Sequence, residues 1–304
     1  MILCDLADAP AAKELAGYFE RGKMIRPLLV LLATAAAGGD ETKALPAAEA
    51  LELLHGAALV HDDIVDQAEE RRGLPALHSR IGEAAALVVG DYLILRAFEV
   101  LARRAEGVNS LGVLKAVRLL SRYAQDCCRG QIQELKSPEF DCSEQQYYAM
   151  VRGKTASQFV AAVSLGAIFG KAADEDLRNL RRYAVNAGIA FQIRDDELDV
   201  TGDSAVLGKP AGNSIKAGRP LLPLIYLTKD GSSDELAAYQ AMAKDGSNRR
   251  DLVELLEREG ALERVRQAEQ RFLARALSAL DGLRPSKARD ALSAIATYSV
   301  YRDC

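Results

Sequence analysis

Apolar residues recur at steps of three and four along most of this chain, the spacing of one face of an α-helix. Between Ala47 and Glu70 the apolar positions include Ala50, Leu51, Leu54, Ala57, Ala58 and Val65. The same spacing predicts further helices over residues 83–105, 111–136, 158–169, 174–200 and 252–280. Ser143 and Gln146 have the spacing of a capping box, which predicts a helix that includes Tyr147. No run of alternating β-branched residues predicts a strand.

Glycine, proline and asparagine cluster between the predicted helices, at residues 38–39, 73–75, 137–138, 208–212 and 245–248. None of these breaks is long enough to be a domain linker. Apart from two similar acidic clusters, no repeat or low-complexity segment is present. We therefore expect one all-α domain, a multi-helix bundle over residues 1–304.

The composition is that of a globular protein with close helix packing. Of its 304 residues, 49% are hydrophobic and 27% are charged, alanine is plentiful and tryptophan is absent. A net charge of −4 without a Lys/Arg block argues against nucleic acid as a partner. The five cysteines are odd in number and form no CxxC pair, which favours a reduced, cytoplasmic protein. The longest apolar stretch, Pro27–Gly39, is too short to span a membrane.

Two acidic clusters of the form DDxxD lie within predicted helices. Their aspartates are Asp62, Asp63 and Asp66 in the first and Asp195, Asp196 and Asp199 in the second. The outer two aspartates of each cluster are four residues apart and share a helical face, where like charges destabilise a helix unless a cation binds. Carboxylates without paired His or Cys favour a hard ion such as Mg²⁺, typically shared with substrate phosphates. A solvated acidic face explains one such cluster equally well, but two with basic turns beside them favour metal sites.

Basic residues next to glycine or proline flank these clusters, at places where the backbone turns and a diphosphate can approach. They are Lys23, Arg26, Arg71, Arg72, Lys154, Lys209 and Arg219. Six aspartates and two diphosphates would bring about −12 into one cavity, and about three Mg²⁺ with these side chains would bring about +13. This near balance of formal charge suggests a site for two diphosphates.

With these motifs, the chain resembles the trans-isoprenyl diphosphate synthases, the polyprenyl synthase family, from about Gly22 to Arg302. The segments that carry the resemblance are GKMIRP, ELLHGAALVHDDIVDQAEERRGLP, VGDYLILRAF, GKTAS, FQIRDDELDVTGD and GKPAGNSIKAGRPLLP. The resemblance implies an all-α bundle around a deep central cavity, usually a homodimer. It also implies Mg²⁺-dependent, head-to-tail condensation of isopentenyl diphosphate with an allylic prenyl diphosphate.

The resemblance further implies a role for each matching residue. Mg²⁺ would be coordinated by Asp62, Asp66, Asp195 and Asp199, with support from Asp63 and Asp196. The allylic diphosphate or its metal cluster would be contacted by Arg71, Lys154, Thr155, Gln192, Lys209 and Arg219. Isopentenyl diphosphate would be held by the Gly22 backbone, Lys23, Arg26, His55 and Arg72. The reaction would depend most on Asp62, Asp66, Arg71, Lys154, Asp195 and Lys209.

The chain departs from the family pattern at three positions. Arg21, Ser214 and Arg219 stand where glycine, aspartate and lysine are usual. Arginine keeps the charge of lysine but changes its geometry, so these differences bear on rate or affinity rather than on reaction type. Less sequence precedes the first motif than is common, and we expect residues 1–20 to form a short N-terminal helical segment.

Product length in this family depends on the side chains that block the growing prenyl tail. Ala57 and Ala58 lie five and four residues before Asp62, where a bulky residue stops growth early, and Leu54 and Leu51 come before them. Two small residues leave the passage open. We therefore predict a medium-to-long all-trans polyprenyl diphosphate, with a short-chain geranylgeranyl or farnesyl diphosphate synthase as the alternative.

Three other functions fit part of the pattern. A class I terpene cyclase also has a DDxxD helix, but its second metal site usually mixes Asn, Ser or Thr with acids. Glu52 and His55 fit the ExxH motif of a di-iron carboxylate bundle, but no second ExxH is present. A catalytically silent subunit of a heteromeric synthase would be expected to lose acids from one cluster, and all six are present.

Overall fold

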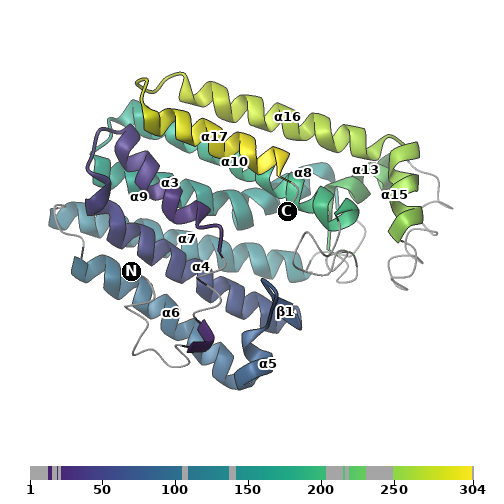
Figure 1. Cartoon of the computed structure of the whole chain (residues 1–304), viewed down its shortest axis with the longest axis horizontal. Helices are drawn as coiled ribbons and strands as arrows, with labels where there is room; N and C mark the ends of the chain where they lie inside the picture. The colour runs from purple at the N-terminus through teal and green to yellow at the C-terminus, as the bar shows by residue number, and fades with distance from the viewer. Residues whose placement is uncertain are drawn as a thin grey trace. The chain divides into compact units, whose positions relative to one another are not determined.

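The computed structural model describes residues 13–15, 19, 22–104, 109–136, 142–202, 215, 219–230 and 249–302. These residues form α-helices almost throughout, which confirms the predicted all-α class (Figure 1). The chain divides into two compact units, the first with residues 1–124, 159–181 and 282–292 and the second with residues 125–158, 182–281 and 293–304. The single domain expected over residues 1–304 stays a prediction, and the segment 1–20 lies largely outside the described residues.

The elements of the first unit are α3 (Ile25–Ala36), η1 (Glu41–Ala44), α4 (Leu45–Val65), β1 (Glu70–Arg71), β2 (Leu74–Pro75), α5 (Leu77–Ile81) and α6 (Glu83–Arg104). Those of the second unit are α8 (Glu144–Val151), the π-helical turn η2 (Arg152–Ala156), α13 (Leu222–Asp230), α15 (Arg249–Arg258) and α16 (Ala261–Leu280). Residues of both units are found in α7 (Ser110–Lys136), α9 (Ser157–Gly170), α10 (Asp174–Thr201) and α17 (Lys287–Tyr301). Within the described ranges, no helix combines the length and the hydropathy that crossing a membrane requires.

Helix α4 is the central helix of the first unit. It packs against α3 and α6 and is buried along most of its length, including the charged residues Glu49 and Glu52. A proline in its first turn suits a helix start, because the backbone N–H that proline lacks would have no partner there. The prediction that this helix reaches Glu70 was wrong. It ends at Val65, because Gln67 adopts a positive φ of 49° and takes the chain out of the helix.

The chain after α4 forms a tight antiparallel hairpin. Strands β1 and β2 pair Glu70 with Pro75 and Arg71 with Leu74. The two residues between them, Arg72 and Gly73, have φ values of 55° and 72°. Positive φ at both central residues defines a type I′ turn, whose twist matches that of the flanking strands. The hairpin holds the basic pair Arg71–Arg72 in a fixed backbone conformation.

The described helices of the second unit pack in a connected series. Helix α13 contacts α8, α15 and α16, and α15 contacts α16. The capping box predicted at the start of α8 is confirmed by reciprocal hydrogen bonds between Ser143 and Gln146. The prediction of one helix over residues 252–280 was wrong, because Gly260 takes a left-handed φ of 69° and separates α15 from α16.

Candidate active site

The first acidic cluster lies at the C-terminal end of α4. Asp62 is half-buried and Asp66, the C-cap residue, is exposed. The Asp66 amide donates to the Asp62 carbonyl at 2.8 Å, so the last turn keeps its helical form and the two aspartates stay one turn apart. The negative end of the helix dipole disfavours carboxylates here, and a bound cation would offset that cost.

The middle aspartate of this cluster is buried and paired. Asp63 has no measurable solvent exposure and accepts hydrogen bonds from Nε of Arg71, at 2.8 Å, and from its Nη2. The carboxylate therefore fixes the Arg71 guanidinium against the end of α4. This geometry suits the expected role of Asp63, which is to support the metal ligands rather than to bind the metal alone. That Asp63 and Asp66 belong to a metal site stays a prediction.

The residues expected to hold isopentenyl diphosphate include a buried histidine among arginines. The pKa of His55 lies well below its usual value, first because of burial and then because Arg26, Arg72 and Arg71 repel a positive charge. His55 is therefore neutral at pH 7. Its Nδ1 atom is buried and, within the described ranges, has no hydrogen-bond partner.

Gly22 and Arg72 lie against each other in the same unit. A Cβ atom at Gly22 would be 2.7 Å from Nη1 of Arg72, so a side chain at this position would displace the guanidinium. Lys23 is exposed, whereas Arg26 is half-buried at the start of α3. The structure thus brings Gly22, Arg26, Arg72 and His55 into one neighbourhood.

Glu52 belongs to this neighbourhood and was not predicted as part of the site. It is only 3% exposed. Burial raises its pKa, and Arg26 and Arg72 oppose that rise. The sequence signal was an acid three residues before His55 in an otherwise apolar segment, the same pair that fits the ExxH motif of a di-iron site.

The middle aspartate of the second cluster is also buried and hydrogen-bonded. Asp196 accepts from the Tyr147 hydroxyl at 2.6 Å, from the Gln192 amide at 2.9 Å and from the Leu222 backbone N–H at 3.2 Å. Burial raises the pKa of Asp196 to about 7, although the three hydrogen bonds oppose the rise. Tyr147 was missed in the sequence, because 48 residues separate it from the nearest aspartate of the cluster.

The outer aspartates of the second cluster differ in exposure. The Asp195 side chain is 34% exposed and forms an ion pair with Arg302. Asp199 is buried, with 3% of its surface exposed. Their predicted roles as metal ligands are not tested by these contacts.

The GKT motif forms the π-helical turn η2, a distortion that is frequent at functional sites. The Thr155 hydroxyl donates to the Gln192 side-chain oxygen at 2.6 Å. Lys154 forms an ion pair with Glu134, and Nε of Arg219 lies 3.7 Å from the same carboxylate. Glu134 was not predicted as a site residue. In the sequence it is a single acidic residue near the end of α7, outside both DDxxD clusters.

The remaining predicted residues are Lys209 and the chain-length residues of α4. Lys209 lies outside the described residues, as do Arg21 and Ser214 among the departures from the family pattern. Of the predicted chain-length residues on α4, Leu51, Leu54 and Ala57 are buried and Ala58 is half-buried.

The donor chemistry of the two clusters fits Mg²⁺. Asp62, Asp66 and Asp195 offer hard carboxylate oxygens with accessible side chains. Among the described residues, no group of three or more His, Cys, Asp and Glu forms a complete metal site. Mg²⁺ is usually bound by one or two carboxylates together with water and substrate phosphates, so the residues present suit an ion shared with a diphosphate.

Comparison with known proteins gives concordant matches. The family model for polyprenyl synthetase matches residues 10–258. The short chain isoprenyl diphosphate synthase of Methanothermobacter thermautotrophicus is 35% identical over 285 residues, which cover 93% of this chain and 87% of that protein. The octaprenyl diphosphate synthase of Escherichia coli is 32% identical over 286 residues, covering 93% and 86%. The crystal structure of a Caulobacter crescentus polyprenyl synthase, complexed with calcium and isoprenyl diphosphate, has a TM-score of 0.90 at 30% identity and covers 100% of this chain and 93% of that one.

Proposed function

Because the chain belongs to the polyprenyl synthetase family and is a prenyltransferase, we propose that it condenses isopentenyl diphosphate with an allylic prenyl diphosphate, head to tail. One observation carries the proposal. In both DDxxD clusters the middle aspartate is buried and hydrogen-bonded while the first aspartate stays accessible. This division of roles is what a metal site with a supporting carboxylate requires.

The outer aspartates of each cluster are proposed to bind the metal. Asp62 and Asp66, with Asp195 and Asp199, would hold about three Mg²⁺ ions on the allylic diphosphate. Bound Mg²⁺ would neutralise the negative charge that develops on the diphosphate as it leaves. Asp63 and Asp196 would keep the clusters and their neighbours in position.

The basic residues are proposed to hold the two diphosphates. Those for the allylic substrate are Arg71, Lys154, Lys209 and Arg219, with the polar side chains Thr155 and Gln192. Those for isopentenyl diphosphate are Lys23, Arg26 and Arg72, with the Gly22 backbone and His55. Because His55 is neutral, it would donate a hydrogen bond to this substrate without adding charge.

We propose a product of medium to long chain length. Ala57 and Ala58, the residues expected to limit growth, carry small side chains on α4. The relatives carry names from short chain to octaprenyl synthases, so this proposal rests on the two alanines. A short-chain product, or a cyclised product without diphosphate, is an alternative outcome of the assay below.

The assay incubates the purified chain with Mg²⁺, labelled isopentenyl diphosphate and allylic starters from C5 to C20. We expect all-trans prenyl diphosphates longer than C20, and no product after chelation of the metal. Asp62→Asn should lower kcat by about 100-fold or more, because it removes a carboxylate ligand. Asp251→Asn, at an exposed position on α15, is the matched control and should retain activity.

Each result bears on one part of the proposal. No extension of any starter would refute prenyl condensation. Extension that stops at C15 or C20 would leave the reaction in place and refute the chain-length proposal. A normal rate for Asp62→Asn would remove Asp62 from the mechanism.

We further propose that the protein forms a homodimer through α6. Large apolar side chains are exposed on this helix, and they belong to Leu87, Val88 and Leu95. Large apolar side chains exposed on one helix, two turns apart, are a feature of interaction sites. A second copy of the chain is the occupant that the family resemblance favours.

A further inference from the structure

The end of α17 reaches the second acidic cluster within the second unit. Arg302, just after the last helical residue, is 7% exposed, and its guanidinium donates to the Asp195 carboxylate. It also donates to the backbone carbonyls of Ser299 at 3.2 Å and Phe191 at 3.5 Å, and its central carbon lies 4.1 Å from the centre of the Phe191 ring. The proposed function gives Arg302 no role.

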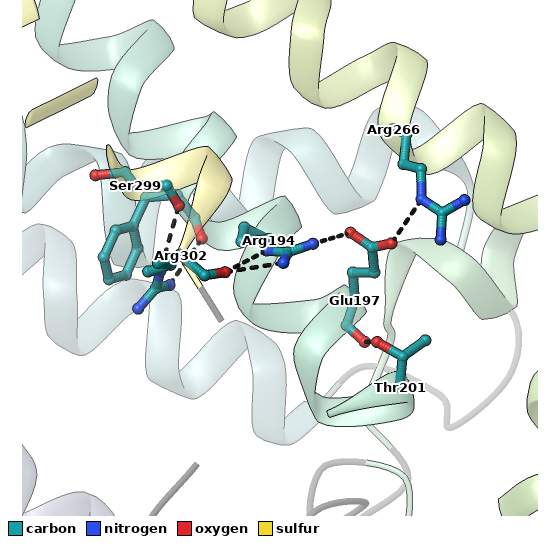
Figure 2. A network of polar contacts seen from close by, with 7 residues as sticks. Arg194, Glu197, Thr201, Arg266, Ser299 and Arg302 are labelled. Atoms are coloured by element: carbon teal, nitrogen blue, oxygen red, sulfur yellow. Dashed lines mark hydrogen bonds and ion pairs between the residues drawn. The ribbon is translucent and has the colours of Figure 1, made fainter. Parts of the chain in front are cut away.

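The backbone of Arg302 is held as firmly as its side chain. Its carbonyl accepts hydrogen bonds from Nε and Nη2 of Arg194, at 3.0 and 2.8 Å. Figure 2 shows how Arg194 continues the network, since its Nη1 donates to Glu197 at 2.7 Å and Glu197 also pairs with Arg266 of α16 at 3.0 Å. The network therefore joins α10, α16 and the end of α17.

This network makes release of Arg302 unfavourable. Glu197 is 2% exposed, so its pair with Arg194 is costly to break, and Arg194 in turn holds the Arg302 backbone in place. Moving the guanidinium away would also break its contacts with Asp195, two carbonyls and the Phe191 ring. Arg302 is thus better suited to stay beside Asp195 when a metal binds than to be displaced by it.

We infer that Arg302 is a positioning residue, which orients the Asp195 carboxylate toward the metal of the second cluster. This inference rests on the proposed function, in which Asp195 is a metal ligand. The contact engages Oδ1 of Asp195, and the side chain remains 34% exposed, so the carboxylate stays accessible to an ion. Carboxylate ligands are commonly oriented by such hydrogen bonds, and loss of the partner typically lowers metal affinity 10- to 100-fold.

The test measures binding of Mn²⁺ alone to the full chain, from the electron paramagnetic resonance signal of free Mn²⁺. Arg302→Gln should weaken binding by about 10- to 100-fold. Arg302→Lys keeps the charge but loses the planar fork, and it should weaken binding by about 3- to 10-fold. Arg289→Gln, which removes a positive charge from α17 at a residue paired with Asp290, is the control and should bind as the unmodified chain does.

The outcomes separate this inference from the proposed function. Wild-type or tighter Mn²⁺ affinity in a folded Arg302→Gln variant overturns the positioning role and leaves prenyl condensation untouched. If circular dichroism shows that Arg302→Gln does not fold, Arg302→Lys decides, and unchanged affinity in that variant overturns the inference. If the unmodified chain does not bind Mn²⁺ in the absence of a diphosphate, prenyl condensation is unaffected, and the Mg²⁺ requirement of prenyl transfer decides the role of Arg302.

A second readout is the Mg²⁺ concentration that gives half-maximal prenyl transfer. It should rise in Arg302→Gln by a factor similar to the loss of Mn²⁺ affinity, and saturating Mg²⁺ should restore most of kcat. A purely structural role would lower stability without moving this concentration. An unchanged metal requirement therefore counts against the inference.

Discussion

The buried acidic residues of this chain differ in the groups that offset the cost of burying a carboxylate. Asp63 faces Arg71, and Asp196 accepts three hydrogen bonds. Glu269 of α16 is 3% exposed, and within the described residues its Oε1 atom has no hydrogen-bond partner. Burial and the nearby Glu197 raise the pKa of Glu269 to about 8, so this side chain is protonated below that pH.

Glu269 should make stability depend on pH. Its pKa is about 8 when folded against 4.5 ordinarily, so the native state binds the extra proton between these values. Its contribution to the free energy of unfolding is therefore complete below about pH 4.5. That contribution is lost as pH rises toward 8, by at most about 1.4 kcal/mol per pH unit.

Glu269→Gln keeps the shape of the side chain without titrating, so its urea-denaturation stability should fall less steeply than that of the unmodified chain. The window to measure is about pH 5 to pH 8. Glu263→Gln, at an exposed position on the same helix, is the control and should follow the unmodified curve. Parallel curves for Glu269→Gln and the unmodified chain would contradict the raised pKa.

At the scale of elements, α3 and α9 pack at very short range within the first unit. A Cβ atom at Gly166 would overlap the Val30 carbonyl oxygen and lie 2.7 Å from Cβ of Ala33. The Thr34 hydroxyl donates to the Gly166 carbonyl at 3.1 Å, across the same contact. Glycine is required here because backbone, not a flexible side chain, occupies the space.

Gly166→Ala should therefore destabilise the protein by about 1–3 kcal/mol, because the two helices must separate to admit a methyl group. The measurement is the free energy of unfolding in urea. Gly153→Ala is the control, since among the described residues outside its own helical turn no atom lies within 4 Å of a Cβ added there. A Gly166→Ala variant as stable as the unmodified chain would show that the helices adjust without strain.

At the scale of the whole molecule, the exposed apolar side chains of α6 predict self-association. Light scattering should give a mass of about twice the 32.8 kDa of one chain. Leu95→Glu places a charge at a position that is 70% exposed in the single chain, and it should shift the protein toward monomer. Leu28→Glu, at a 42% exposed position on α3, should leave the mass unchanged. A monomeric unmodified chain would contradict the proposed dimer.

Most of the helices could be predicted, but some of their ends could not. Periodic apolar positions located α6, α7, α9 and α10 to within one residue at each end. The end of α4 depends on a positive φ at Gln67, a conformation that glutamine rarely adopts and that its sequence does not signal. Gly260 was a possible break, but the apolar spacing continues across it.

The sequence alone determined the helical class, the one-turn spacing of the outer aspartates and the chemistry of their carboxylates, because each depends on residues within a few positions of one another. Only the tertiary structure decided which aspartate of each cluster is buried and what it contacts. Tyr147 meets Asp196 and Arg302 meets Asp195 through packing between segments far apart in the chain. Such contacts arise from burial and charge pairing in the folded protein, and local sequence patterns carry no signal of them.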